Sequence, residues 1–466
     1  MRAAGPRRRG DLTQGPIART LLVFALPQIA GNVMQTLNGS INAIWVGRLL
    51  GERALAATAN ANLVMFLLFA LSFGLGMAAT VRIGQAFGAQ DIAAARRTLG
   101  TALGVTGGLA LLLAATGWLA APALLDLLGT PGEARGEALT YLRIIFLGTP
   151  GIMLTAMIAM GLRGIGDATS PLIFMVLTAV LDIALNPLLI LGIGPLPALG
   201  IAGSAWASVI ATSVGFVGIV FWLYWRDLPL RLRGAELGLL RPRADETRFL
   251  LAKGLPMGAQ MLVIAGAGLV MIALVNREGL MTAAAYGALL QLFNYVQMPA
   301  LAIGAAVTAM MSQHIGAGLE ARVHMISRSG AIINTAMTAM LVAALFAFGR
   351  LALGLFLGPD SPAVDIALHI QSIMLWSYLP FGITIVLFGT LRAYGVVWVQ
   401  LITLFVSMYI LRLGAYYALY PVMNSDALWV SQLVSSIASL VIILWVYRRG
   451  RWRRVPAQRG GGAGRV

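Results

Sequence analysis

Residues 170–193 read SPLIFMVLTAVLDIALNPLLILGI, an apolar run in which Asp182 is the only charged residue. A helix needs about 20 apolar residues to cross the hydrocarbon layer of a bilayer. Because lipid offers no hydrogen-bond partners, the backbone of such a run has to be helical inside the membrane. The stretch therefore predicts a transmembrane helix with one carboxyl group at its centre.

Runs of this kind recur along the whole chain. Of the 466 residues, 59% are hydrophobic and 11% are charged, whereas a soluble domain carries about 25% charged residues. We therefore predict an all-α integral membrane protein with twelve transmembrane helices. Their expected ranges are 19–47, 55–83, 98–121, 138–161, 170–193 and 200–225 in the first half, and 249–275, 281–311, 328–349, 366–391, 397–420 and 427–447 in the second.

The distribution of the 33 Lys and Arg residues predicts the topology. Most of them fall in the termini and in alternate connections, and positively charged loops remain on the cytoplasmic side. We therefore expect a multi-pass protein of the cell inner (cytoplasmic) membrane with both termini in the cytoplasm. The triplet Arg7–Arg9 would also suit a secretory or twin-arginine signal, but no small-residue cleavage site follows it, so we expect the first helix to be retained.

The two halves of the chain carry a weak internal repeat. At offsets of 228 or 229 residues, Leu26-Pro27 matches Leu255-Pro256, Gly76 matches Gly304, and Leu162-Arg163 matches Leu391-Arg392. Two six-helix lobes of equal orientation predict pseudo-two-fold symmetry along the membrane normal. The predicted parts are an N-terminal tail (1–18), an N-terminal lobe (19–225), a cytoplasmic linker (226–248), a C-terminal lobe (249–447) and a basic tail (448–466).

A stripe of amides runs along one face of the first helix. It consists of Gln28, Asn32, Gln35, Asn38 and Asn42. Amides that face lipid are costly, so this face should look into protein or into a water-filled cavity. We favour a cavity lining, in particular for Gln35 and Asn38; the alternative is hydrogen bonding between helices.

Asp182 stands at the centre of the fifth helix, where a charged carboxylate is costly unless it is protonated, paired or in contact with water. Thr178 and Asn186 lie four residues to either side of it and share its helix face. Pro187 has no N–H group, which leaves the carbonyl of Ile183 free. Together these groups could hold a proton or a small hard cation. The alternative is a single acid that a neighbouring helix holds as a packing contact.

The second half of the chain has fewer polar candidates. Gln291, Asn294 and Tyr295 on the eighth helix are predicted to line the substrate cavity, as is Thr178 in the first half. Arg412 lies inside the eleventh helix, and its guanidinium cannot lose its proton. It could pair with helix carbonyls, snorkel to the interface or repel cations, and we favour a structural role.

Several function classes are disfavoured by what the sequence lacks. There is no cysteine, the three histidines are scattered, and no Gly-rich loop ends in Gly-Lys-Ser/Thr. We therefore expect no metal site, no cofactor and no nucleotide hydrolysis, so that an ion gradient or the substrate gradient has to supply the energy. A membrane-embedded enzyme would need paired acids or a His cluster inside the helices. The formal charge of +16 reflects topology, and no nucleic-acid partner is expected.

The loop Leu162–Pro171, LRGIGDATSP, resembles the R-G-x-G-D-x-x-x-P motif of the multidrug and toxic compound extrusion (MATE) family, in its bacterial type. Further similar segments follow in the family's order and cover most of the chain. They are IWVGR at 44–48, GQAFGA at 84–89, LNP at 185–187 and GIAGSA at 200–205. The resemblance implies export of lipophilic organic cations by alternating access of two lobes, in exchange for a proton or sodium.

The resemblance also implies an ion-coupling site in the N-terminal lobe. Asn42 stands where many members carry Asp, and the fifth-helix pair occurs in reversed order as Asp182 and Asn186. The hydroxyl of the sixth helix matches Ser208. We expect Asp182 to exchange the ion while Asn42, Asn186 and Ser208 orient it.

Two further expectations concern partners and the nearest alternative function. Two lobes that enclose a pathway need no second subunit, so we expect a monomer in the lipid bilayer. A flippase for lipid-linked saccharides shares the two-lobe plan. Such a protein should have a strongly cationic cavity, and Arg412 is the only candidate residue for one.

Overall fold

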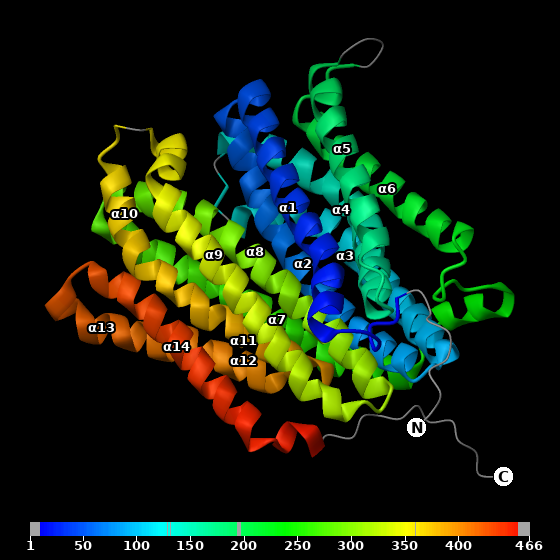
Figure 1. Ribbon diagram of the computed structural model, residues 1–466. Coiled ribbons are helices and arrows are strands. Elements are labelled where there is room, and N and C mark those ends of the chain that lie inside the picture. The colour runs from blue at the N-terminus through cyan, green and yellow to red at the C-terminus, as the bar shows by residue number, and fades with distance from the viewer. Residues whose placement is uncertain (1–9, 128, 131, 193–196, 359, 455–466) are drawn as a thin grey trace. The chain divides into compact units, whose positions relative to one another are not determined.

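The computed structural model describes residues 10–127, 129–130, 132–192, 197–358 and 360–454 (Figure 1). Within these ranges the chain is helical without any strand, and twelve helical segments are long and apolar enough to cross a membrane. The predicted all-α membrane fold with twelve spans is therefore confirmed. The arginine triplet at 7–9 and residues 455–466 of the basic tail lie outside the described residues.

Eight of the twelve spans of the described chain are single α-helices, two are interrupted, and two include a short 3-10 turn at one end. The first six are α1 (Ile17–Leu50), α2 (Glu52–Gly88), α3 (Ile92–Leu127), α4 (Gly132–Gly164), α5 (Thr169–Leu191) and α6 (Ile201–Trp225). The second six are α7 (Ala244–Val275), α8 (Leu280–Gly316), α9 (Val323–Leu357), α10 (Ala363–Met374) with α11 (Tyr378–Ala393), α12 (Trp398–Phe405) with α13 (Arg412–Met423), and α14 (Asp426–Arg449).

Most helices extend beyond the ends predicted from hydropathy. The α2 helix continues to Gly88 and α9 continues to Leu357. Hydropathy reports only the part of a helix that lies in hydrocarbon, whereas backbone hydrogen bonding continues into the interface. The predicted spans are therefore correct in number and position, but most of them are too short.

Two of the spans in the second half are interrupted. A 3-10 turn, Leu375–Ser377, separates α10 from α11, and Pro380 follows directly in the first turn of α11. Proline has no N–H to continue the helical ladder, which suits it to the start of a helix. A π-helical turn, Val406–Leu411, separates α12 from α13 and ends immediately before Arg412.

The chain divides into two compact units. One unit holds residues 11–29 and 259–466, and the other holds residues 30–258 together with Gly10. The divisions fall inside α1 and α7, so each of these helices contributes its N-terminal part to one unit and the rest to the other. The lobe limits proposed from the sequence, 19–225 and 249–447, lie at or within a few residues of helix ends and stay a prediction.

The N-terminal part of α1 packs into the unit that contains α8 and α9. Leu21 is fully buried, and a Cβ atom added at Gly330 of α9 would lie 3.6 Å from its side chain. The buried Gln28 donates a hydrogen bond to the carbonyl of Phe24 in its own helix, at 3.2 Å. The first amide of the α1 stripe is therefore satisfied locally.

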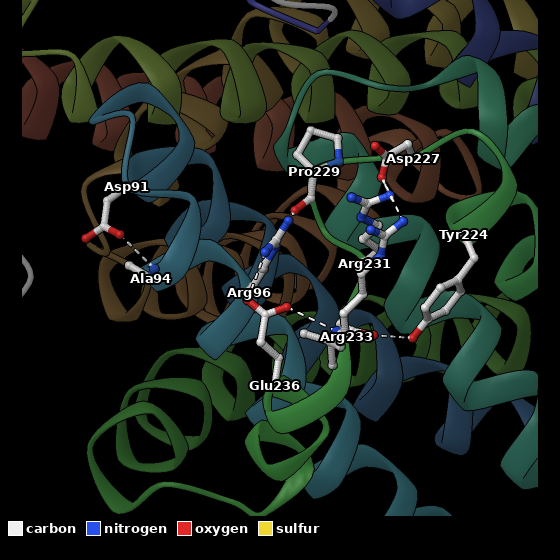
Figure 2. A network of polar contacts seen from close by, with 10 residues as sticks. Asp91, Ala94, Arg96, Tyr224, Asp227, Pro229, Arg231, Arg233 and Glu236 are labelled. Atoms are coloured by element: carbon white, nitrogen blue, oxygen red, sulfur yellow. Dashed lines mark hydrogen bonds and ion pairs between the residues drawn. The ribbon is translucent and has the colours of Figure 1, made fainter.

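The segment between α6 and α7 is attached to α3 by polar contacts (Figure 2). Arg96 of α3 donates one hydrogen bond to the carbonyl of Pro229 and one to the carboxylate of Glu236, both at 2.8 Å. Within the segment, Arg231 forms an ion pair with Asp227. The basic stretch between α6 and α7 is thus attached to α3 by hydrogen bonds and is not a free linker.

Glycines of α3 allow this close attachment. The segment forms a 3-10 helix, Gly234–Leu240, beside them. A Cβ atom added at Gly100 would lie 2.8 Å from the carbonyl oxygen of Leu239, and one added at Gly104 would collide with the carbonyl of Leu240. Only glycine lets the two backbones approach this far.

The pair of Arg96 and Glu236 should make the stability of this unit depend on acid pH. The hydrogen bond from Arg96 holds the pKa of the Glu236 carboxyl below its usual value. Such a group contributes stability that is complete above its ordinary pKa of about 4.3 and is lost as the pH falls through the depressed value. Because the pair is partly exposed, Glu236→Gln should lower the free energy of unfolding by at most about 1 kcal/mol at neutral pH.

Thermal melting of both proteins in detergent over a pH series checks this expectation. The difference between wild type and Glu236→Gln should shrink as the pH falls through the depressed pKa of Glu236. A difference of constant size down to the most acid pH would contradict the assignment.

Candidate ion-coupling site

Asp182 lies in the middle of α5 with 4% of its surface exposed. One carboxylate oxygen, Oδ1, accepts hydrogen bonds from the Ser208 hydroxyl at 2.9 Å and from the Asn186 amide at 3.1 Å. The other oxygen, Oδ2, accepts a hydrogen bond from the Asn38 amide at 3.0 Å. The acid is therefore held by three neutral donors, which come from α1, α5 and α6 of the same unit.

The local sequence of α5 sets the first of these contacts. Asn186 follows Asp182 by four residues, which places both side chains on one face of the helix. Its amide nitrogen also donates to the backbone carbonyl of Asp182 at 2.9 Å. Pro187 comes next in the helix and supplies no N–H of its own. The Asn186 side chain is thus oriented by two acceptors of a single residue.

The contact from α6 depends on a close approach of the two helices. A Cβ atom added at Gly203 would lie 2.5 Å from the carbonyl carbon of Leu189 and 2.8 Å from the nitrogen of Ile190. At Gly218, an added Cβ would lie 2.7 Å from the ring of Phe174. Ser208 lies between these two glycines, so its hydroxyl reaches the carboxylate of α5.

The charge of Asp182 has no counter-ion among the residues that the structure describes. The ion pairs of this unit join other residues, such as Arg82 with Glu246 and Arg135 with Asp126. A buried carboxylate that is stabilised only by neutral donors remains costly in a low-dielectric medium. Such a group gains most from binding one cation, either a proton or a small metal ion.

Two amide oxygens at the site are unused. The Oδ1 atoms of Asn38 and Asn186 are buried and have no hydrogen-bond partner, because each amide turns its nitrogen toward Asp182. Rotation of either amide would present oxygen instead of nitrogen to the carboxylate and to any ion bound there. The described residues contain no cluster of three or more His, Cys, Asp or Glu side chains that would bind a metal by itself.

The structure thus brings together three of the four residues predicted for ion coupling, namely Asp182, Asn186 and Ser208. The contact from α1 comes from Asn38 and not from the fourth, Asn42. Asn42 lies one helical turn further along α1 and accepts a hydrogen bond from Ser204 at 3.4 Å. Asn38 had been predicted as a cavity residue, and it is the α1 amide that reaches Asp182. The coupling role of Asn42 stays a prediction.

The remaining predicted cavity residues lie away from these contacts. Thr178 is partly buried and faces the backbone at Gly215 of α6, while Gln35 of α1 is exposed. On α8, Gln291 and Tyr295 are exposed and Asn294 is partly buried. The α8 residues belong to the unit of residues 259–466, and their role as substrate contacts stays a prediction.

One neighbour of Asp182 was not predicted from the sequence. Tyr141 of α4 is buried, with 5% of its surface exposed, and its hydroxyl is close enough to interact electrostatically with the Asp182 carboxylate. Its position near the start of the fourth predicted helix gave a weak signal, since a tyrosine there is equally typical of the membrane interface.

Comparisons with known proteins agree with the repeat and with the fold. The model of the MatE family matches residues 27–188 and 256–417, two segments of equal length that begin at the repeat-related Pro27 and Pro256. The probable multidrug resistance protein YoeA of Bacillus subtilis is 32% identical over 433 residues, which cover 92% of this chain and 93% of that protein. Its YpnP counterpart in the same organism is 29% identical, with 95% and 97% covered.

Among solved structures, the crystal structure of MATE in the straight conformation matches with a TM-score of 0.88 at 22% identity. It covers 97% of this chain and 99% of that chain. This likeness concerns the arrangement of the helices and extends over nearly the entire chain.

Proposed function

Since this chain belongs to the MatE family, we propose that it is a cation-coupled antiporter that exports lipophilic organic cations. As a member of a family of multidrug transporters it is not an enzyme. Its place is the cytoplasmic membrane of a bacterium, with both termini on the cytoplasmic side. Export proceeds by alternating access of two lobes within one monomer.

The observation that carries the proposal is the solitary carboxylate of Asp182, with three neutral donors and no counter-ion among the described residues. A site of this kind is unfavourable when it is negatively charged and empty. It therefore releases one cation readily only when another positive charge replaces it. Exchange of a bound ion for a cationic substrate follows from this competition.

The contacts of the carboxylate favour a proton as the coupling ion. Asn38, Asn186 and Ser208 all present N–H or O–H groups to the carboxylate, whereas a sodium ion needs oxygen atoms directed at itself. Sodium is the alternative ion, since the two unpartnered amide oxygens could supply ligands after rotation. A flippase for lipid-linked saccharides is the second candidate function. It is less favoured because, among the described residues, Arg412 is the single cation near the midpoint of a span that would support a pyrophosphate cavity.

Gradient jumps on proteoliposomes test the proposal. Vesicles containing the protein and a fluorescent cationic dye are diluted into buffer of lower pH, or into buffer of equal pH with added sodium. The pH jump should drive dye efflux well above that of protein-free vesicles, and the sodium jump should not. Efflux driven only by sodium would assign the other ion, and efflux that responds to neither gradient would contradict cation coupling.

A further inference from the structure

Arg412 is a buried cation near the midpoint of the span Trp398–Met423. Only 5% of its surface is exposed, so the side chain does not snorkel to the membrane interface. The hydroxyls of Tyr286 on α8 and Tyr378 on α11 lie close enough to interact electrostatically with its guanidinium. All three residues belong to the unit of residues 259–466.

No carboxylate of the described residues compensates this charge. The ion pairs of the same unit join Arg350 with Asp365 and His369 with Asp426 at the ends of the helices. The Nε atom of Arg412 is buried and has no acceptor. A guanidinium cannot shed its proton to escape this environment, so the site needs a negative group from elsewhere.

The helix itself is altered at this point. At the offset of 229 residues that relates Leu162 to Leu391, Asp182 would correspond to Leu411. The π-helical turn Val406–Leu411 adds one residue to the helix, which brings Arg412 into the position equivalent to Asp182. Tyr416 then follows Arg412 by four residues, as Asn186 follows Asp182. The second repeat therefore holds a fixed cation where the first repeat holds an acid.

We propose that Arg412 and Tyr286 form a binding site for an acidic group, a carboxylate or a phosphate, on the exported molecule. The planar guanidinium presents paired N–H groups that match the oxygens of such an anion. Tyr378 is only partly buried and adds a hydroxyl to the site. This inference rests on the proposed export of organic cations and narrows the substrates to zwitterions that carry a lipophilic cation and an acidic group.

Binding of two matched dyes to the purified protein tests the site. A rhodamine free acid and its ethyl ester differ only in the carboxylate, and fluorescence polarisation gives the Kd of each. Wild type should bind the free acid about 10-fold more tightly than the ester, as expected for a charge-assisted hydrogen bond. Arg412→Gln should reduce this ratio to about one, and Tyr286→Phe, which keeps the ring, should reduce it in part.

Three further measurements make the outcome decisive. Arg350→Gln, a change at an exposed arginine of the same unit, should leave the ratio as in wild type. Asp182→Asn should also keep the ratio, so that a failure of ion coupling is separable from a failure of this site. Riboflavin phosphate against riboflavin repeats the comparison for a phosphate and distinguishes the two acidic groups.

Two results would overturn the proposal: a wild-type protein that binds each partner without the acidic group as tightly as the acid, or an Arg412→Gln protein that keeps the preference. If Arg412→Gln does not elute as a folded monodisperse protein, the preference for the acid is measured with Tyr286→Phe and Arg412→Lys instead. Arg412→Lys retains the charge but loses the paired N–H groups, and it should keep only part of the preference.

Discussion

Asp182→Asn is expected to reduce ion-coupled efflux to the rate of vesicles without protein. Asparagine has the size of aspartate. Its oxygen can accept from Ser208 and Asn186, and its NH2 can donate to the unused oxygen of Asn38 once that amide rotates, so the fold should persist. It cannot carry a proton or neutralise a cation, and no other carboxylate of the described residues shares the donors of Asp182. Dye efflux under a pH jump, with equal amounts of reconstituted protein, measures the effect.

Two companion variants define what this result means. Asp126→Asn removes an exposed acid of the same unit that pairs with Arg135, and it should leave efflux unchanged. Ser208→Ala removes one of the three donors while Asn186 still serves the same oxygen. Loss of a hydrogen bond to a charged group predicts a decrease of roughly 10-fold and not abolition. Undiminished efflux by Asp182→Asn would exclude Asp182 as the coupling residue.

Gly203→Ala is expected to lower the melting temperature by several degrees and to impair efflux as well. The added Cβ atom would lie 2.5 Å from the carbonyl carbon of Leu189 and 2.8 Å from the nitrogen of Ile190. Both neighbours are backbone atoms that cannot rotate away, so α5 and α6 have to move apart. Overpacking of this kind costs about 1–3 kcal/mol, and it also draws the Ser208 hydroxyl away from Asp182.

A second glycine serves as the control, because changing it to alanine adds the same methyl group without crowding another helix. Gly108 is exposed in the middle of α3, and an added Cβ would have nothing within 4 Å. Gly108→Ala should therefore melt at the wild-type temperature or slightly above it, because alanine is the better helix former. Equal melting temperatures for Gly203→Ala and wild type would show that α5 and α6 adapt without cost.

Hydropathy predicted the spans because a long apolar segment in lipid has to satisfy its backbone hydrogen bonds internally, which a helix does. It also singled out Asp182, since one acid within an apolar run is conspicuous, and it placed Asn186 on the same face by helical periodicity. The sequence could not show that Asn38 rather than Asn42 contacts this acid. That choice depends on the position of α1 along its axis relative to α5. Asn38 and Asn42 are one helical turn apart on the same face, so the sequence pattern is the same whichever of them lies opposite Asp182.

Other features escaped prediction for similar reasons. The π-helical turn Val406–Leu411 before Arg412 contains no proline or glycine that would mark it in the sequence. The attachment of residues 226–243 to α3 depends on Gly100 and Gly104, whose significance appears only when Leu239 and Leu240 lie against them. The role of Tyr141 depends on which face of α4 is buried.

The division of the two units inside α1 and α7 has a mechanical consequence. At both of these divisions the chain continues as one helix, and Pro27 and Pro256 precede the points of division by two residues. Each proline removes one rung of the hydrogen-bond ladder, which lowers the bending stiffness of the helix at that place. Both helices should therefore bend more easily beside these points than an α-helix with an unbroken ladder.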